Sequence, residues 1–260
     1  MTDPATDPAF RYPTADGVIR SVEEYRSRYL PAQHDPAHIG TRIRRTVGLL
    51  CDHAGEEPRR VLDYGCGTGW FLYHLSLRRP AWSVEGWDGD PSSMAIARGC
   101  FAADNIAYRD EPYDAHLQLN DQTEATFDVI TFLEVLEHVT DPQAILSSFH
   151  EGLRPGGLVV VSTPYALGYG PNITELRRRV NLGVRRRSND GYAKLLRERP
   201  YDPTTNNGHV ASYTPDTLAT LLSVSGFTAL TFALSPITRA PLRRLLPETL
   251  IMVARKETRP

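Results

Sequence analysis

The chain has 260 residues, 41% of them hydrophobic, and a formal net charge of −2. This length and apolar content suffice for one domain with a full core, and the near balance of charge excludes an overall attraction to nucleic acid or anionic membranes. The opening residues "MTDPATDPAF" lack the basic and apolar regions of a targeting signal, no apolar run approaches the ~20 residues of a membrane span, and the three cysteines lack C-x-x-C spacing. We therefore expect a cytoplasmic protein with reduced thiols.

The N-terminal quarter is expected to be an arm followed by helices. Residues 1–18, rich in Pro, Asp, Ala and Thr, predict a flexible arm ahead of a single domain over 19–260. Helices are expected over about 21–29 and 37–53. The second carries a stripe of apolar residues at helical spacing, at Ile39, Ile43, Val47 and Leu50.

From Val61 onwards strands alternate with helices. Apolar or alternating runs predict strands over 61–64, 82–88, 127–133, 158–163, 228–234 and 249–255. Pro in a first turn and apolar residues on one face predict helices over 70–79, 90–101, 141–153 and 214–226. This order indicates an open, mainly parallel α/β sheet of the Rossmann-like, doubly wound class, in which the last two strands add an antiparallel edge.

A glycine-rich turn follows the first strand of this sheet. In "VLDYGCGTGWF" three glycines, Gly65, Gly67 and Gly69, come directly after a run that ends in Asp63. Glycine permits positive φ and lets backbone N–H groups approach a ligand closely, and ligands of such sheets bind beyond the carboxyl ends of the strands. Asp88 ends the next strand, at the distance expected of a ribose-binding acid. The turn is therefore the candidate nucleotide site.

Two nucleotide families compete for this pattern. Dinucleotide-binding folds carry G-x-G-x-x-G, whereas this chain has D-x-G-x-G-x-G, which resembles motif I of the class I S-adenosylmethionine-dependent methyltransferases. "GWDGDPSSMAIAR", "FDVITFLEVLEHV" and "LRPGGLVVVSTP" are similar to later motifs of that family in the same order. The resemblance covers roughly 55–165 and the stretch "YTPDTLATLLSVSGF". It implies a seven-stranded sheet, S-adenosylmethionine as methyl donor and S-adenosylhomocysteine as product.

The resemblance also assigns residues to the cofactor. It places Asp63 opposite the amino group of the methionine part, Asp88 at the ribose hydroxyls, and the peptide at Leu133 and Glu134 under the sulfonium. Asp114 is a weaker candidate for the adenine, because its surroundings match the family poorly, and a solvated loop acid is the alternative. The full expected cofactor set is Asp63, Gly65, Cys66, Gly67, Gly69, Trp87, Asp88, Gly89, Asp114, Leu133 and Glu134.

The string "EVLEHV" after the fourth predicted strand supplies the candidate catalytic residues Glu134, Glu137 and His138. His138 is the candidate general base, because imidazole titrates near neutral pH. Glu-x-x-Glu-His also resembles a divalent-metal element of ubiquinone-biosynthesis O-methyltransferases and small-RNA 2′-O-methyltransferases, in which His209 would complete the set. Similar strings occur in metal-free methyltransferases, so a metal-free site is the expectation and a metal site the alternative.

Residues 164–212 interrupt the alternation and are expected to form an insert on the acceptor side. Within 173–200 nine basic residues stand against three acidic ones, including the triplets 177–179 and 185–187. Either the arginines form a solvated face, or they recognise an anionic group on the acceptor.

Together these features predict methyl transfer to a small-molecule acceptor, at oxygen rather than at nitrogen or carbon. Two alternatives remain. One is an RNA or protein methyltransferase, which the absence of an added RNA-binding domain and of a broadly basic composition weakens. The other is a non-catalytic S-adenosylmethionine-binding protein, which the intact glycine turn and acids weaken. The identity of the acceptor lies beyond the sequence.

Overall fold

The computed structural model describes residues 12–13, 19–20, 40–109, 126–166, 211–235 and 247–257. Several sequence predictions lie outside these residues: the helix expected over 21–29, the candidates Asp114 and His209, and nearly all of the insert with both arginine triplets. Near the N-terminus, two short strands, β1 (Tyr12–Pro13) and β2 (Ile19–Arg20), pair antiparallel.

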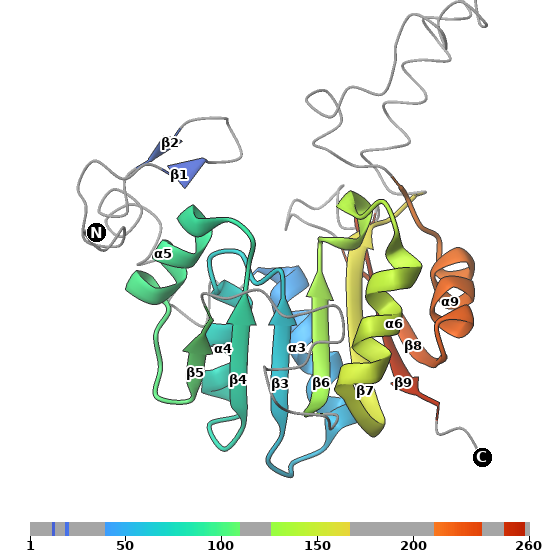
Figure 1. Cartoon of the computed structure of the whole chain (residues 1–260), viewed down its shortest axis with the longest axis horizontal. Helices are drawn as coiled ribbons and strands as arrows, with labels where there is room; N and C mark the ends of the chain where they lie inside the picture. The colour runs from blue at the N-terminus through green and yellow to red at the C-terminus, as the bar shows by residue number, and fades with distance from the viewer. Residues whose placement is uncertain are drawn as a thin grey trace, which may run out of the picture.

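The centre of the protein is a seven-stranded sheet in the order β5-β4-β3-β6-β7-β9-β8 (Figure 1). β9 pairs antiparallel with both β7 and β8, and the other neighbouring pairs are parallel. The predicted antiparallel strand is therefore confirmed, and it lies between β7 and the edge strand β8. The strands are β3 (Arg60–Tyr64), β4 (Ser83–Trp87), β5 (Ile106–Tyr108), β6 (Phe127–Leu133), β7 (Leu153–Pro164), β8 (Phe227–Ser235) and β9 (Thr249–Lys256).

Helices cover both faces of this sheet. They are α3 (Thr41–Ala54), α4 (Trp70–Arg78), α5 (Pro91–Cys100), α6 (Pro142–Gly152), α9 (Pro215–Val224) and the 3₁₀ turn η2 (Leu136–His138). Three of them begin at the predicted caps, because Asp90, Asp141 and Thr214 each accept backbone N–H bonds just before a proline in the first turn. Within the described ranges, no helix is long and apolar enough to cross a bilayer.

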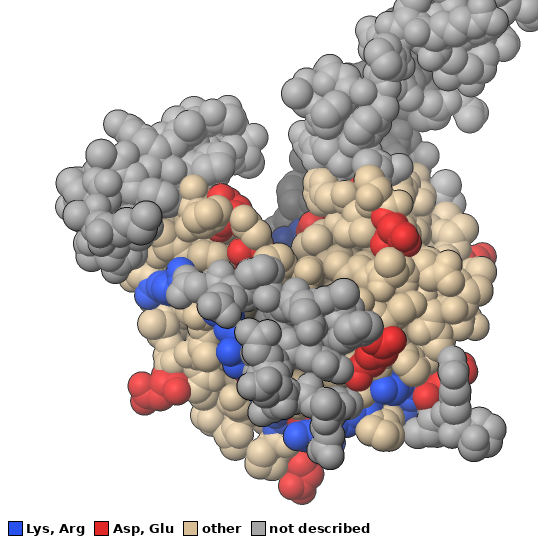
Figure 2. Space-filling view, viewed as in Figure 1, with Lys and Arg blue, Asp and Glu red and all other residues tan. Residues whose placement is uncertain are grey.

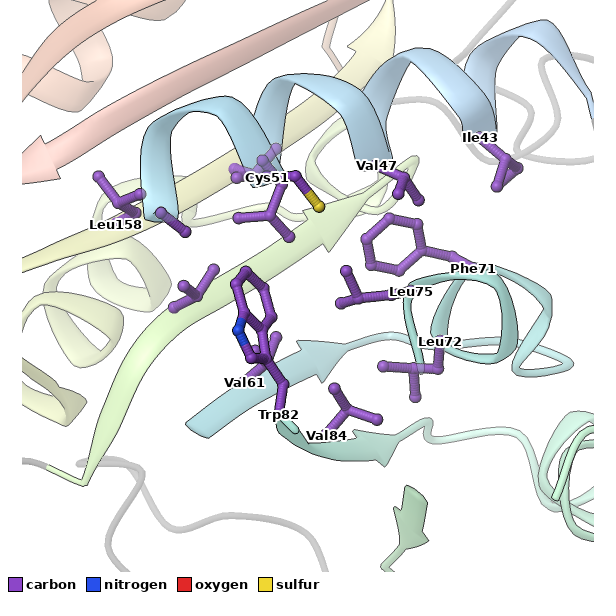
Figure 3. Packing of buried hydrophobic residues seen from close by; sticks show 14 of the residues in the cluster. Ile43, Val47, Cys51, Val61, Phe71, Leu72, Leu75, Trp82, Val84 and Leu158 are labelled. Carbon is purple, nitrogen blue, oxygen red and sulfur yellow. The ribbon is translucent and has the colours of Figure 1, made fainter. Parts of the chain in front are cut away.

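Two hydrophobic clusters hold the layers together, one on each face of the sheet. On one face, α3 and α4 pack on β3 and β4 through residues such as Val47, Phe71 and Val84, with Trp82 buried beneath them (Figure 3). On the other face, α6 packs on β7 and α9 packs on β8 and β9, and Phe149 and Leu218 belong to the same cluster. Because neighbouring residues of β6 enter opposite clusters, both faces of this strand are buried, as its continuous apolar run predicted.

Three local differences from the sequence prediction stand out. α3 begins at Thr41 rather than near residue 37. The residue before it, Gly40, has an extended, non-helical backbone, so the helix cannot start earlier than Thr41. β5, which has only three residues, two half-buried and one exposed, was not predicted. The "RPGG" segment, which lies between the predicted helix over 141–153 and the predicted strand over 158–163, belongs to β7, because pairing of Phe127 with Leu153 carries the ladder past an irregularity in register.

Charged side chains on the described surface are mixed in sign. On the face shown in Figure 2, basic and acidic groups lie among each other rather than in separate fields. Below the surface, Glu85 is 4% exposed and forms ion pairs with Arg60 and Arg109. These pairs compensate a charge that would otherwise be costly to bury.

Candidate functional site

The candidate site lies where β3, β4 and β6 end, at the same edge of the sheet (Figure 1). The three strands run parallel, so their carboxyl ends bring three segments together: the glycine turn (residues 65–69), the acid at position 88 and the segment 134–138. Each segment follows a strand directly, so the sheet fixes their relative positions. Parallel strand direction alone brings the three segments to one edge of the sheet.

The glycine turn needs its glycines for two different reasons. Gly65, Gly67 and Gly69 all have positive φ, at 80°, 54° and 81°. A Cβ on Gly65 would lie 2.5 Å from Val135, and one on Gly69 would lie 2.2 Å from the Tyr108 hydroxyl, so these two glycines are required by protein packing. A Cβ on Gly67 would meet nothing within 4 Å. Gly67 is therefore the position at which the turn faces open space.

The turn is anchored on the end of β4. The N–H groups of Gly65 and Cys66 both donate to the carbonyl oxygen of Trp87, at 2.8 and 3.0 Å. The N–H of Gly67 donates to Oδ2 of Asp88 at 2.8 Å, and the N–H of Asp90 donates to Oδ1 at 2.8 Å. The Asp88 carboxylate thus ties the turn to β4 and retains lone pairs for a ligand.

Asp63 is a buried carboxyl at the floor of the site. It is 2% exposed and pairs in register with Thr131 of β6, whose hydroxyl donates to its Oδ1 at 2.5 Å. Burial raises the pKa of Asp63 to about 7, and nearby Asp88 adds to the rise, although the Thr131 hydroxyl opposes it. A carboxylate held this way gains most from a cationic ligand, because the cation replaces the lost hydration.

The neighbouring residues shape the walls of the site. Cys66 is buried against Met94, and burial raises the pKa of its thiol, so it is a packed small residue rather than a nucleophile. All three cysteines are free, as predicted, and all three are buried. The half-buried ring of Trp87 packs on Tyr64, with 4.7 Å between ring centroids, and Gly89 lies beside its outer edge. The peptide after half-buried Leu133 begins the segment 134–138.

Glu134 has an unusual backbone and two side-chain partners. Its φ of 58° is the only positive value for a non-glycine residue among those described, a conformation that costs energy and often marks functional positions. The Ser162 hydroxyl donates to Oε1 at 2.7 Å, and Nη1 of Arg42 lies 3.0 Å from Oε2. The cation beside Glu134 in this structure is thus the guanidinium of α3.

Glu137 and His138 occupy different environments, although they are neighbours in sequence. Glu137 is 2% exposed, and burial, reinforced by the charge of Glu134, raises its pKa to about 7. Tyr213 lies close enough that Glu137 raises the pKa of its phenol, after the larger effect of burial. His138 is exposed. Glu137 therefore faces the interior, and His138 is accessible from solvent.

The described part of the chain contains no cluster of three or more His, Cys, Asp or Glu residues arranged to hold a metal ion. Glu134, Glu137 and His138 do not form such a cluster by themselves, and His209 lies outside the described residues. The structure does bring together Asp63, Asp88, the three glycines and Glu134.

Sequence reasoning missed four polar residues of the site: Arg42, Thr131, Ser162 and Tyr213. Thr131 and Ser162 are polar residues within the apolar runs of β6 and β7, and that interruption at the carboxyl end of a strand was a usable signal. Arg42 is one of several arginines at the start of α3, and no local pattern distinguishes it. Its role follows only from the fold.

Comparison with known families and structures agrees with this geometry. A family model described as a methyltransferase domain matches residues 32–231. Among solved structures, a chain of the complex between the Haloferax volcanii Trm112 methyltransferase activator and a methyltransferase superposes with a TM-score of 0.60 at 14% identity, covering 92% of this chain and 99% of that chain. An S-adenosylmethionine-dependent methyltransferase from Mesorhizobium loti superposes with a TM-score of 0.56 at 22% identity, covering 82% and 96%. At these identities the two structures establish the fold alone.

Curated relatives share more sequence over a shorter length. The ubiquinone biosynthesis O-methyltransferase of Alkalilimnicola ehrlichii is 34% identical over 167 residues, which are 63% of this chain and 65% of the relative. The enzyme of the same name from Neisseria meningitidis is 40% identical over 114 residues, 43% of this chain and 46% of the relative. The matches thus span between about half and two thirds of these relatives. The family match, the sheet order and the site geometry together show that the chain belongs to the class I S-adenosylmethionine-dependent methyltransferases.

Proposed function

We propose that this methyltransferase binds S-adenosylmethionine across the glycine turn and transfers its methyl group to an oxygen atom of a small-molecule acceptor. The observation that carries the proposal is the pair of acids around Gly67: buried Asp63 below the turn and Asp88 bonded to the Gly67 N–H. Membership of the family implies the cosubstrate. The residues present fit it, since an open, positive-φ glycine lies between two carboxylates.

Each residue of the cofactor site then has a role. The Asp63 carboxylate takes the ammonium of the methionine part, because a cation relieves its desolvation. Asp88 accepts from the ribose hydroxyls with the lone pairs that Gly67 and Asp90 leave free. Trp87 and Gly89 line the adenosine side, and Leu133 and Glu134 lie under the sulfonium. Asp114, outside the described residues, stays a weaker candidate for the adenine.

The chain itself has little covalent chemistry to perform. The bound cosubstrate supplies a methyl group attached to a positively charged sulfur. The sulfur is already a good leaving group, because it departs as a neutral thioether. The protein must align the acceptor in line with that bond, exclude water and accept the acceptor's proton. We assign the proton to His138, because it is exposed, follows β6 at the same edge of the sheet as the glycine turn, and carries an imidazole, the side chain that most often serves as a general base.

Oxygen is the preferred acceptor atom because relatives 34% to 40% identical to this chain are ubiquinone biosynthesis O-methyltransferases.

An anionic group on the acceptor would account for the excess of nine basic over three acidic residues in 173–200. Replacing the triplet 177–179 or 185–187 with glutamates should then raise the acceptor KM without moving cofactor affinity. If neither triplet alters the KM, the arginines are a solvated face.

Transfer of a labelled methyl group from S-adenosylmethionine tests the proposal directly. The panel of acceptors should contain catechols and other phenols with and without a carboxylate, matched amines, total RNA and a protein extract. The proposal predicts labelled methyl ethers of small molecules, lost in the Asp63→Asn variant. Label in RNA or protein alone, or cofactor binding without transfer to any class of acceptor, would contradict it.

A further inference from the structure

A cavity lies at the opposite end of the sheet from the glycine turn. It has a volume of about 160 Å³ and lies at the amino-terminal ends of β6 and β7, beside the last turn of α3. Figure 3 shows Leu158 of β7 near the C-terminal end of α3, whereas Ile43 lies near the other end of the helix. The methyltransferase site described above uses none of its lining residues.

The charged lining of this cavity is mostly basic. Arg59, Arg154 and Arg255 contribute three guanidinium groups from three separate segments, and Asp128 contributes one carboxylate. His53 adds an imidazole from α3. Even with this histidine neutral, three positive charges oppose one negative charge, so the cavity carries a surplus of about two positive charges.

Two of these arginines are held in place. Nε and Nη2 of Arg59 donate to the carbonyl of Ala54, at 3.1 and 2.9 Å, which caps the end of α3. Nη1 of Arg154 donates to both oxygens of Asp128, at 3.0 and 3.1 Å, and Asp128 also accepts from the backbone N–H of Arg60. Asp128 therefore orients the basic groups rather than neutralising the whole cavity.

Arg255 and His53 differ in what they can offer an anion. The exposed side chain of Arg255, on β9, makes no hydrogen bond or ion pair with any residue in the described ranges. Nδ1 of His53 lies 2.8 Å from the carbonyl oxygen of Leu49 and so donates to it, which leaves Nε2 of the neutral ring as an acceptor that offers an anion no hydrogen bond. An anion in the cavity would thus meet donors of Arg59 and Arg154, which are already held in place, and the free guanidinium of Arg255.

We propose that this cavity is a binding site for a phosphate group, separate from the methyltransferase site. A tetrahedral dianion matches both the charge surplus and the guanidinium groups of Arg59 and Arg154, which both reach Asp128 and whose planar donors pair with phosphate oxygens. The cavity has room for the group, since its volume corresponds to several water molecules. The phosphate is either the free ion or the phosphoryl group of a small metabolite.

Isothermal titration of the full chain with inorganic phosphate, at constant ionic strength against chloride, tests the proposal. The variants are Arg154→Gln and Arg255→Gln, alone and combined, because both side chains are exposed and their loss should leave the fold intact. Arg44→Gln is the matched control. Arg44 is also an exposed arginine, but it lies in the first turn of α3, far from the last turn of that helix, which lines the cavity. Each test variant should weaken phosphate binding by about tenfold or more, and the control should leave it unchanged.

A phosphate monoester, glycerol 2-phosphate, distinguishes the two sources. Tighter binding of the monoester than of phosphate assigns the site to a phosphorylated metabolite, and equal or weaker binding assigns it to the free ion. Saturating S-adenosylhomocysteine should leave phosphate affinity unchanged, because the two sites lie at opposite ends of the strands. The proposal is overturned if phosphate shows no saturable binding, if the double variant binds it as tightly as the wild type, or if S-adenosylhomocysteine displaces it.

Discussion

Nη1 of Arg42 lies 3.0 Å from Oε2 of Glu134, which joins the first turn of α3 to the segment that follows β6. The side chains are 35% and 21% exposed, so water partly screens the pair. The Ser162 hydroxyl holds the other oxygen of Glu134, so helix, strand end and carboxylate form one connected unit. Arg42 thereby places a positive charge next to Glu134 and near Glu137.

A double-mutant cycle of Arg42→Ala and Glu134→Ala should reveal this coupling. We expect a coupling free energy of about 0.5–1 kcal/mol in chemical denaturation at low salt, because a partly exposed pair contributes only modestly. The coupling should shrink at 1 M salt, where the Debye length is ~3 Å. Arg44→Ala paired with Glu134→Ala is the control cycle and should show none. Equal coupling free energies in both cycles would mean that Glu134 responds to the overall positive charge at the start of α3 and not to a specific pair with Arg42.

The affinity for S-adenosylmethionine should depend on pH through Asp63. Its pKa is about 7 in the free protein, and a bound ammonium favours the ionised form, so binding below pH 7 releases a proton. The dissociation constant should therefore fall as pH rises, by up to about tenfold per pH unit below 7, and level off above that value. Titration calorimetry between pH 5.5 and 8 measures the slope.

Asp63→Asn is the control for this dependence. The variant should bind S-adenosylmethionine weakly, and its dissociation constant should change little over the same pH range. If the variant keeps the wild-type slope, the titrating group is not Asp63.

The pH dependence of stability tests the Asp63 pKa independently of the cofactor. The raised pKa means that the folded state binds the proton more tightly, so the free energy of unfolding falls as pH rises from about 3.8 to about 7. This fall should be smaller in Asp63→Asn.

The glycines of the turn should respond differently to a methyl group. Gly69→Ala would press Cβ into the Tyr108 hydroxyl, which donates to the carbonyl of Phe101, and should cost about 2–4 kcal/mol of stability. Gly67→Ala meets no protein atom, so only its positive φ should cost stability, about 1–2 kcal/mol. Cofactor affinity should nevertheless fall about tenfold in Gly67→Ala, measured on the folded fraction. Full affinity in that variant would mean that the ligand does not approach Gly67.

Chelation separates the two interpretations of the segment 134–138. Because Arg42 and Ser162 already occupy the Glu134 carboxylate, we expect methyl transfer to survive exhaustive chelation. His138→Ala should lower kcat with little change in cofactor affinity, as expected of a general base. Activity lost on chelation and restored by one divalent ion would contradict this, and would implicate Glu134, Glu137, His138 and His209 as ligands.

The fold was largely predictable from local patterns. β6 matches its predicted range because burial on both faces leaves a continuous apolar run, and the caps of α5, α6 and α9 follow from Asp or Thr before proline. β5 escaped prediction because three residues, none of them fully buried, leave no pattern. The start of β7 escaped because its pairing with Phe127, not its own sequence, makes "RPGG" part of a strand.

The candidate site was predictable only where its residues are contiguous in sequence. The acids at 63 and 88 and the three glycines belong to short motifs next to strand ends, and the sheet places them together. The partners of Glu134 come from α3 and β7, and only the folded sheet brings them to it. The exposure of His138 and the burial of adjacent Glu137 likewise depend on how η2 sits against β7, which no local pattern encodes.

The most direct test of the account compares two neighbouring acids by titration calorimetry with S-adenosylmethionine and with NAD. Asp90→Ala removes the cap of α5 and should cost about 0.5–2 kcal/mol of stability while leaving cofactor affinity nearly unchanged. Asp88→Ala removes the ribose contact and the tie to Gly67, and should weaken S-adenosylmethionine binding by about 1.5–3 kcal/mol in the folded protein. Equal cofactor affinity in wild type and Asp88→Ala, or tighter binding of NAD than of S-adenosylmethionine, would contradict the account.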